Sequence, residues 1–293
     1  MTRLETLLRR IPRFRDLVSE RDTFAGHCER LERELAESLS REGALRRELE
    51  ETGREAATRE RVLREALQSL RPQSGGIRER MRADWDDRAR TEGRSCIASG
   101  RTGWTDEEFF ASGRENVRDH ILTDMEDICR GVEPKQMRIV EIGCGAGRMT
   151  RALAALFGEV HAVDISPEMI RLAREALGGL PNVHLYVNNG ADLSVLPDPP
   201  FHFAFSFIVF QHIPDKTIIE NYVAEVRRLL EPGALFKFQV EGGPAAGRSP
   251  EDTWHGASFT EDELRELAER HGFEARYVEG AGTQYFWAWF FRR

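Results

Sequence analysis

A strand that runs directly into a glycine-rich turn is the feature that most constrains the fold of this chain. Residues 138–142 read RIVEI, and Gly143, Gly145 and Gly147 follow before a helix expected over residues 149–156. Glycine tolerates a positive φ and lets backbone N–H groups approach a ligand without a Cβ atom in the way. The segment therefore predicts the first strand–turn–helix unit of an α/β sheet, with a ligand at the turn.

The same alternation of strands and helices continues almost to the C-terminus. We expect helices over residues 167–177, 216–230 and 261–271, and further strands over residues 160–163, 183–187, 203–210, 235–240, 273–278 and 284–290. Strands that alternate with helices form a parallel sheet covered on both faces. The last two strands leave no room for a helix between them, so they should pair antiparallel. The predicted fold class is α/β, a doubly wound, mostly parallel seven-stranded sheet with an antiparallel last strand.

The first 71 residues have a different character, being rich in Arg, Glu, Leu and Ala. Apolar residues recur at multiples of seven, as at Leu35, Leu49 and Leu63, and this spacing favours a long coiled-coil helix. Polar residues such as Glu42 interrupt the seam, so a solvated single helix or a partly disordered arm is the alternative. We expect the arm to form a homo-oligomer through this seam.

A linker and a helical segment separate the arm from the predicted sheet. Residues 71–76 read RPQSGG, a proline followed by small flexible residues. Helical patterns then return, with an amphipathic helix expected over residues 114–130. The predicted domains are a coiled-coil arm (1–71), a helical lid or cap (72–134) and an α/β domain (135–293).

Charge, hydropathy and cysteine spacing exclude several classes of protein. The formal net charge of −8 disfavours a nucleic-acid partner held by bulk electrostatics. No apolar run reaches the roughly 18 residues that span a bilayer, so no membrane partner is expected, and the N-terminus has no secretory signal. The four cysteines, at positions 28, 96, 129 and 144, lack metal-clamp spacing. We therefore expect no metal site and a cytoplasmic location.

Two nucleotide ligands compete for the glycine turn. The G-x-G-x-x-G fingerprint of dinucleotide sites has its third glycine where this chain has Arg148. Glu141, at the tip of the strand, would repel a pyrophosphate but suits a ligand with a cationic ammonium or sulfonium group. Asp164 follows Gly143 by 21 residues and can accept hydrogen bonds from two ribose hydroxyls. The sequence therefore favours S-adenosylmethionine (SAM) over NAD.

These features resemble motif I of the class I, seven-stranded SAM-dependent methyltransferases. Four later segments resemble the other motifs of that family in the same order, namely 164–169 (DISPEM), 189–193 (NGADL), 205–215 (FSFIVFQHIPD) and 229–234 (LLEPGA). The resemblance covers about residues 135–293. It departs from the family pattern at His202, where Asp is usual, and at Ala234, where Gly is usual.

The resemblance implies a set of cofactor-binding residues. The strand tip and glycine turn would hold the methionine moiety, the next acidic loop the ribose and adenine, the 189–193 segment the adenine edge, and the fourth strand the methionine tail. In that order the residues are Glu141, Gly143, Cys144, Gly145 and Gly147; Asp164, Ile165 and Met169; Asp192 and Leu193; and Ser206 and Phe207. Core packing between helix and sheet is the alternative role for Ile165 and Met169.

Methyl transfer requires a positioned nucleophile and exclusion of water, and a hydroxyl acceptor also needs a general base. The candidates are His212 after the fourth strand, Glu241 after the fifth, and His255 on the loop that follows. A packing or capping role is the alternative for His212. The segment around Trp85 could close over the cofactor as a lid, or could only pack on the sheet.

We therefore expect a SAM-dependent methyltransferase that acts on a small-molecule or saccharide acceptor, with O-methylation favoured over N- or C-methylation. Two alternatives stay open, a non-catalytic SAM-binding scaffold organised by the coiled coil and an NAD-dependent oxidoreductase. Methylation of protein or nucleic acid is disfavoured because the sequence has no target-recognition domain and no basic face.

Overall fold

The structure is a computed structural model of the chain, which divides into two units, Met1–Gln73 and Ser74–Arg293. The described residues are 23, 26, 35–46, 48, 51–52, 76–91, 93–98, 102–244 and 253–293. Most of the predicted coiled-coil arm lies outside these residues. Within the arm, residues 35–46 are helical, and Leu35 and Leu45 are exposed.

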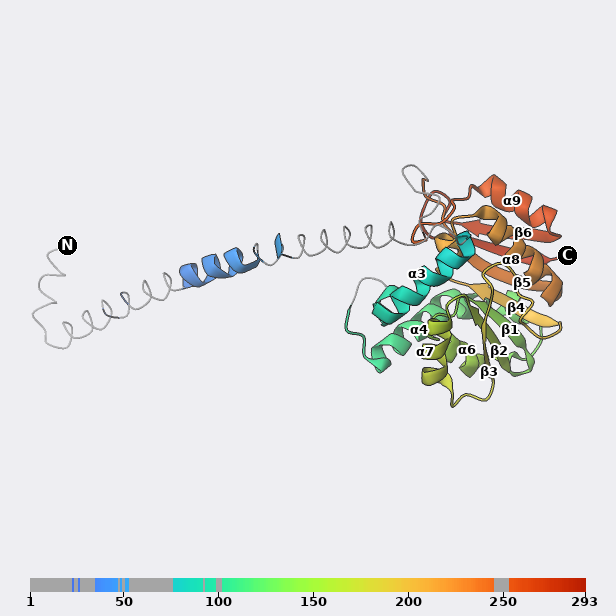
Figure 1. The fold of residues 1–293 in the computed structure, drawn as a ribbon, viewed down its shortest axis with the longest axis horizontal. Coiled ribbons are helices and arrows are strands. Elements are labelled where there is room, and N and C mark those ends of the chain that lie inside the picture. The colour runs from blue at the N-terminus through green and yellow to red at the C-terminus, as the bar shows by residue number, and fades with distance from the viewer. Residues whose placement is uncertain are drawn as a thin grey trace, which may run out of the picture. The chain divides into compact units, whose positions relative to one another are not determined.

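One mixed sheet of seven strands organises the second unit, in the order β3-β2-β1-β4-β5-β7-β6 (Figure 1). The strands are β1 Arg138–Ile142, β2 Glu159–Asp164, β3 Val183–Val187, β4 Phe201–Ser206, β5 Leu230–Val240, β6 Phe273–Glu279 and β7 Phe286–Arg292. Strands β1 to β5 pair in parallel, and β7 runs antiparallel to both β5 and β6. The predicted α/β fold with an antiparallel last strand is confirmed.

Helices cover both faces of this sheet because successive strand residues point to opposite sides. Val140 and Ala204 pack in a cluster with residues of α8 and α9, whereas Ile139 and Phe203 pack with residues of α4 to α7. The helices are α3 Ile77–Thr91, α4 Asp106–His120, α5 Met125–Cys129, α6 Thr150–Leu156, α7 Pro167–Leu177, α8 Lys216–Leu229 and α9 Glu261–Arg270. Within the described residues, no helix is both long enough and apolar enough to cross a membrane.

The continuous helix expected over residues 114–130 is wrong, because α4 ends at His120 and α5 begins only at Met125. The buried Lys237 of β5 causes the break. Its Nζ donates to the His120 carbonyl oxygen (2.7 Å) and to Asp124 Oδ2 (2.8 Å). A continuous helix would use that carbonyl for the N–H four residues later, so the ammonium group ends the helix.

The fourth strand is shorter than the expected 203–210, since β4 ends at Ser206. Ile208 has a φ of 55°, and its N–H donates to Gln239 Oε1 (3.0 Å). A short 3-10 turn, Phe210–His212, follows. The chain therefore turns out of the sheet at the carboxyl end of β4.

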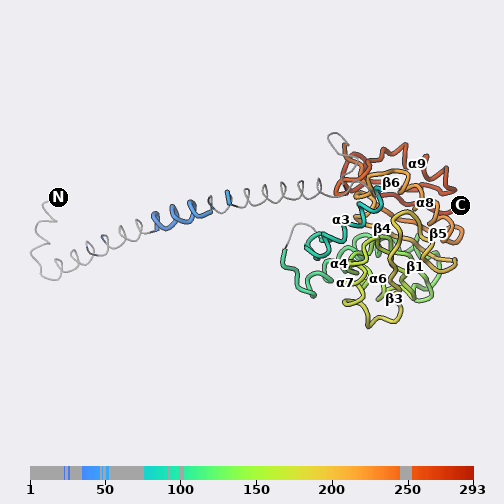
Figure 2. The backbone as a smooth tube through the Cα atoms, viewed as in Figure 1, coloured from blue at the N-terminus to red at the C-terminus, as the bar shows by residue number. Residues whose placement is uncertain are grey.

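Helix α3 packs on α7 and also reaches the loop after β5 (Figure 2). Asp86 Oδ1 accepts hydrogen bonds from Ser166 Oγ (2.5 Å) and from the Glu168 N–H (3.1 Å). Asp84 Oδ2 accepts one from Thr253 Oγ1 (2.8 Å). These bonds hold α3 beside the carboxyl ends of the strands.

Candidate functional site

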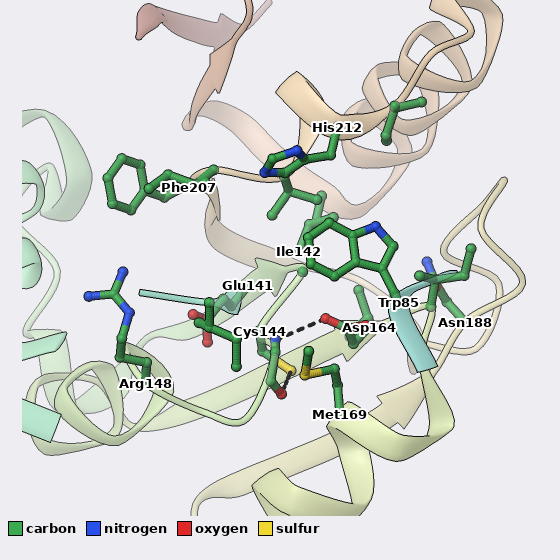
Figure 3. Close-up of a pocket in the computed structure, with 18 of the residues that line it drawn as sticks. Trp85, Glu141, Ile142, Cys144, Arg148, Asp164, Met169, Asn188, Phe207 and His212 are labelled. Carbon is green, nitrogen blue, oxygen red and sulfur yellow. Dashed lines mark hydrogen bonds between the residues drawn. The ribbon is translucent and has the colours of Figure 1, made fainter. Parts of the chain in front are cut away.

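A cavity lies at the carboxyl end of β1, between the ends of its neighbours β2 and β4. Its walls come from the glycine turn, the ends of β2 and β3, the loop after β4, α3 and the 3-10 turn Gly93–Cys96 (Figure 3). The strand order reverses here, and open α/β sheets bind ligands at such a switch point.

At the glycine turn the backbone passes close to the loop that follows β4. Gly143 has a φ of 76°, and a Cβ atom there would overlap the side chain of Val209. Its N–H donates to the Val163 carbonyl oxygen (2.8 Å), which ties the turn to β2. Only glycine fits this position without strain. The floor of the cavity is therefore formed largely by backbone.

Asp164, the last residue of β2, is fixed by backbone donors. The Gly145 N–H donates to Oδ2 and the Ser166 N–H donates to Oδ1, each at 2.9 Å (Figure 3 shows the Gly145 bond). Burial raises the pKa of Asp164 to about 6, although these two hydrogen bonds oppose the rise. Each carboxylate oxygen keeps a lone pair for a further donor. The arrangement suits a ligand with two adjacent hydroxyls.

Glu141 is a second buried carboxylate on the cavity wall. It is 5% exposed, and its Oε2 accepts a hydrogen bond from Thr150 Oγ1 (2.6 Å). Burial raises the pKa of Glu141 to about 7, while the Thr150 bond and the charge of Arg148 oppose the rise. A cationic ligand group nearby would favour the ionised form.

Asn188, directly after β3, is a cavity residue that the sequence analysis missed. Its side chain is 4% exposed, and its Nδ2 donates to the Tyr222 hydroxyl (2.7 Å). Its Oδ1 is buried and has no hydrogen-bond partner among the described residues. A buried oxygen of this kind is satisfied by a ligand N–H. Its place at a strand end was the available signal, because polar residues there face a switch-point ligand.

A chain of hydrogen bonds sets the protonation of His212. Gln239 Nε2 donates to Gln211 Oε1 (2.6 Å), so the Gln211 amide nitrogen is the atom that faces His212 Nε2 (3.3 Å). His212 Nδ1 lies 2.5 Å from the Trp254 carbonyl oxygen, which can only accept. Nδ1 therefore carries a proton, and Nε2 accepts a hydrogen bond from the Gln211 amide.

Aromatic rings enclose His212 from α3 and from the loop after β5. Trp85 meets the His212 ring edge to face with centroids 5.2 Å apart, and it stacks on Trp254 at 6.3 Å. The Arg88 guanidinium lies over both indoles and donates to Thr253 Oγ1 (3.0 Å). Trp85 lines the cavity (Figure 3), so α3 contributes to its wall.

The structure gathers most of the sequence-predicted site residues around this one cavity. The predicted residues that line it are Glu141, Gly143, Cys144, Gly145, Asp164, Ile165, Met169, Phe207 and His212. Six others do not line it, namely Gly147, Asp192, Leu193, Ser206, Glu241 and His255.

The residues outside the cavity have other contacts. Asp192 closes its own turn by accepting from Asn189 Nδ2 (2.8 Å) and Ser194 Oγ (2.6 Å). Ser206 Oγ donates to the Ile142 carbonyl oxygen (3.1 Å). Glu241 is buried and accepts from the Gly243 N–H (2.8 Å), whereas His255 is exposed.

One group of side chains elsewhere has the donors for a metal ion, among the residues that the structure describes. Glu159, His161 and His184 bring their ligand atoms within 4.8 Å of one another. Arg138 Nε, however, donates to Glu159 Oε2 (3.1 Å), and its charge opposes a bound cation. The group lies on β2 and β3, outside the cavity.

Comparison with known proteins shows which proteins this part of the chain is similar to. Residues 139–233 match the model described as "Methyltransferase domain". A ubiquinone biosynthesis O-methyltransferase of Xanthomonas axonopodis pv. citri is 31% identical over 124 residues, which are 42% of this chain and 51% of that protein. A malonyl-(acyl-carrier protein) O-methyltransferase 1 of Ilyobacter polytropus is 30% identical over 43% of this chain and 46% of its own length. The chain thus spans about half the length of these curated relatives.

A solved structure shares the fold at low sequence identity. Magnesium protoporphyrin IX methyltransferase from Synechocystis PCC 6803, solved with bound SAH, superposes with a TM-score of 0.55 at 14% identity. The match covers 74% of this chain and all of that one. The likeness at this identity shows a shared fold, and the glycine turn and Asp164 lie within the residues 139–233 that match the family model.

Proposed function

We propose that the protein is a SAM-dependent methyltransferase that acts on a small-molecule acceptor. One observation carries the proposal: two carboxylates, the buried Glu141 and the half-buried Asp164, flank the glycine turn on the wall of one cavity. A dinucleotide would bring a pyrophosphate dianion to this turn, and the carboxylate of Glu141 would repel it. A ligand with ribose hydroxyls and a cationic amino-acid tail fits the same groups.

The remaining cavity residues fit the rest of SAM. Asp164 has free lone pairs for the ribose hydroxyls, and Ile165 and Met169 offer apolar surface for adenine. The unpartnered Oδ1 of Asn188 would accept a hydrogen bond from the adenine amino group. In this arrangement the Asn188 oxygen would face the adenine amino group, and the carboxylate of Glu141 would lie near the ammonium group of SAM.

We further propose O-methylation, with His212 as the general base. The hydroxyl oxygen of the acceptor attacks the methyl carbon, the carbon–sulfur bond breaks, and the hydroxyl proton moves to His212 Nε2. For this, the acceptor hydroxyl displaces the Gln211 amide from Nε2. Trp85 and Trp254 would exclude water from the site. The names of the curated relatives, both O-methyltransferases, support this choice.

Two experiments test the proposed function. Calorimetric titration of the full chain with SAH should show binding, and incubation of small-molecule and oligosaccharide extracts with isotopically labelled SAM should yield a labelled product by mass spectrometry. Binding without any labelled product would favour the non-catalytic scaffold. Absence of binding at millimolar SAH would refute the proposal, and hydride transfer from NADH would replace it.

Asp164→Ala is expected to weaken SAH binding by about 1–3 kcal/mol, the cost of leaving buried polar groups unpaired. Calorimetry on the folded variant measures the change. Asp192→Ala is the comparison, because Asp192 bonds within its own turn and does not line the cavity. Full affinity in Asp164→Ala would remove it from the ribose site, and a loss in Asp192→Ala would assign the adenine contact to Asp192.

We also propose that the N-terminal arm forms a homo-oligomer. Leu35 and Leu45 are 60% and 65% exposed on the described helical piece. Leu35 lies at a multiple of seven, and Leu45 lies three residues after one, at the second apolar position of the heptad. Deleting residues 1–71 is expected to reduce the number of chains per particle measured by light scattering and to leave SAH affinity unchanged. A full-length chain that is monomeric by the same measurement would contradict this proposal.

A further inference from the structure

Arg148 is a buried cation on the cavity wall. It follows the last glycine of the turn, its side chain lines the cavity, and the residue is only 7% exposed. Its Nη1 donates to Asn116 Oδ1 (2.5 Å) and to Ser112 Oγ (3.3 Å), both on α4. Its Nε is buried and has no hydrogen-bond partner in the described part of the chain.

The charge of this guanidinium is not matched by the protein. Both hydrogen-bond partners are neutral, and no carboxylate of the described residues lies within salt-bridge distance of Arg148. Glu141 acts on it only as a more distant charge. Burying a cation without an anionic partner costs several kcal/mol. An anionic group of a ligand would therefore supply the missing partner for this buried cation.

The position of Arg148 in the cavity indicates which part of the ligand it would contact. Figure 3 shows Arg148 on the far side of Glu141 from Asp164 and Asn188, with its guanidinium directed toward Phe207. The ribose and adenine groups would occupy the Asp164 end. The opposite end therefore receives the amino-acid tail, which carries an ammonium and a carboxylate on one carbon. Glu141 matches the ammonium and Arg148 the carboxylate.

We propose that Arg148, oriented by Ser112 and Asn116 of α4, binds the carboxylate of the methionine moiety of SAM. This inference rests on the proposed function, because it assigns a residue to one group of that cofactor. It also gives α4 a role, since the helix holds the guanidinium by two neutral contacts that leave its charge for the ligand. In the sequence, Arg148 stands at the position of the third glycine of the dinucleotide fingerprint, and that pattern alone does not indicate a role for it.

Three nucleosides that differ only in the tail test the inference. SAH carries both tail charges, decarboxylated SAH (S-adenosyl-3-thiopropylamine) lacks the carboxylate, and 5′-methylthioadenosine lacks the amino acid altogether. Calorimetry on the full chain should show the wild type binding SAH at least tenfold more tightly than decarboxylated SAH. Arg148→Gln should lose SAH affinity at least tenfold and keep its affinity for the other two nucleosides within about twofold. Arg151→Gln, which changes an exposed arginine one turn away, should bind all three like the wild type.

Several results would overturn the inference. Equal loss of all three nucleosides in Arg148→Gln would mean that the residue only shapes the cavity. Unchanged SAH affinity with a raised KM for the acceptor would assign the guanidinium to a carboxylate of the substrate. Equal wild-type affinities for SAH and decarboxylated SAH would refute it without any variant, even if Arg148→Gln failed to fold. By contrast, a wild type that binds none of the nucleosides would remove the proposed function itself.

Discussion

The affinity of the protein for SAH is expected to fall about 1000-fold between pH 8 and pH 5. Burial raises the pKa of Glu141 to about 7 and that of Asp164 to about 6 in the ligand-free protein. The ammonium and ribose hydroxyls of the ligand require the ionised carboxylates. With pKa values of about 7 and about 6, roughly 1% of Glu141 and roughly 10% of Asp164 are ionised at pH 5, whereas most of both are ionised at pH 8. Calorimetry across this range measures the change.

The stability of the ligand-free protein should fall as the pH rises, whereas the affinity for SAH should increase. Both folded-state pKa values lie above the usual values of 4.5 and 3.8. Their contribution to stability is therefore complete below about pH 4 and is lost as the pH rises through 6 and 7. Because SAH is expected to bind more tightly at pH 8, the rise in Tm that it produces should be larger at pH 8 than at pH 5.

Glu141→Gln is the matched control for this pH dependence. The amide keeps the shape of the side chain and can still accept a hydrogen bond from Thr150, but it does not titrate. The variant should bind more weakly than the wild type at pH 8, and its affinity should change less between pH 8 and pH 5. A wild-type affinity that is flat over this range would show that the carboxylates do not meet the charged tail and ribose.

The sequence was sufficient for those parts of the fold that depend on neighbouring residues. β1 and α7 have the predicted bounds, because apolar runs, a capping Ser166 and Pro167 at the helix start act locally. The glycine turn and Asp164 were also accessible, since their spacing along the chain carries the signal.

What the sequence did not predict depends on partners far away in the chain. Lys237 ends α4 from a strand 117 residues later than His120, and Gln239 holds Ile208 out of β4. The unpartnered atoms of Arg148 and Asn188 become visible only when burial and hydrogen bonds are known. Hydrophobic periodicity contains no information on such contacts.

Gly113→Ala is expected to destabilise the second unit by about 2 kcal/mol and to weaken SAH binding. Alanine is favoured over glycine inside a helix by about 1 kcal/mol, so propensity alone predicts a more stable protein. A Cβ atom at Gly113 would, however, overlap the backbone carbonyl of Arg148. The backbones of Gly113 and Arg148 cannot move aside as a flexible side chain can. The cost of the steric overlap is therefore larger than the gain in helix propensity. α4 must then shift, and with it Ser112 and Asn116, which orient Arg148.

Gly43→Ala provides the control for helix propensity in the same chain. Gly43 also lies in a helix, but a Cβ atom there meets no other atom within 4 Å. Urea unfolding should therefore leave Gly43→Ala as stable as the wild type or slightly more stable, while Gly113→Ala unfolds at lower urea. Equal or greater stability of Gly113→Ala would mean that α4 does not sit against the glycine turn. The contacts of α4 with Arg148 would then lose their structural basis, because those contacts and the close approach of Gly113 belong to the same interface.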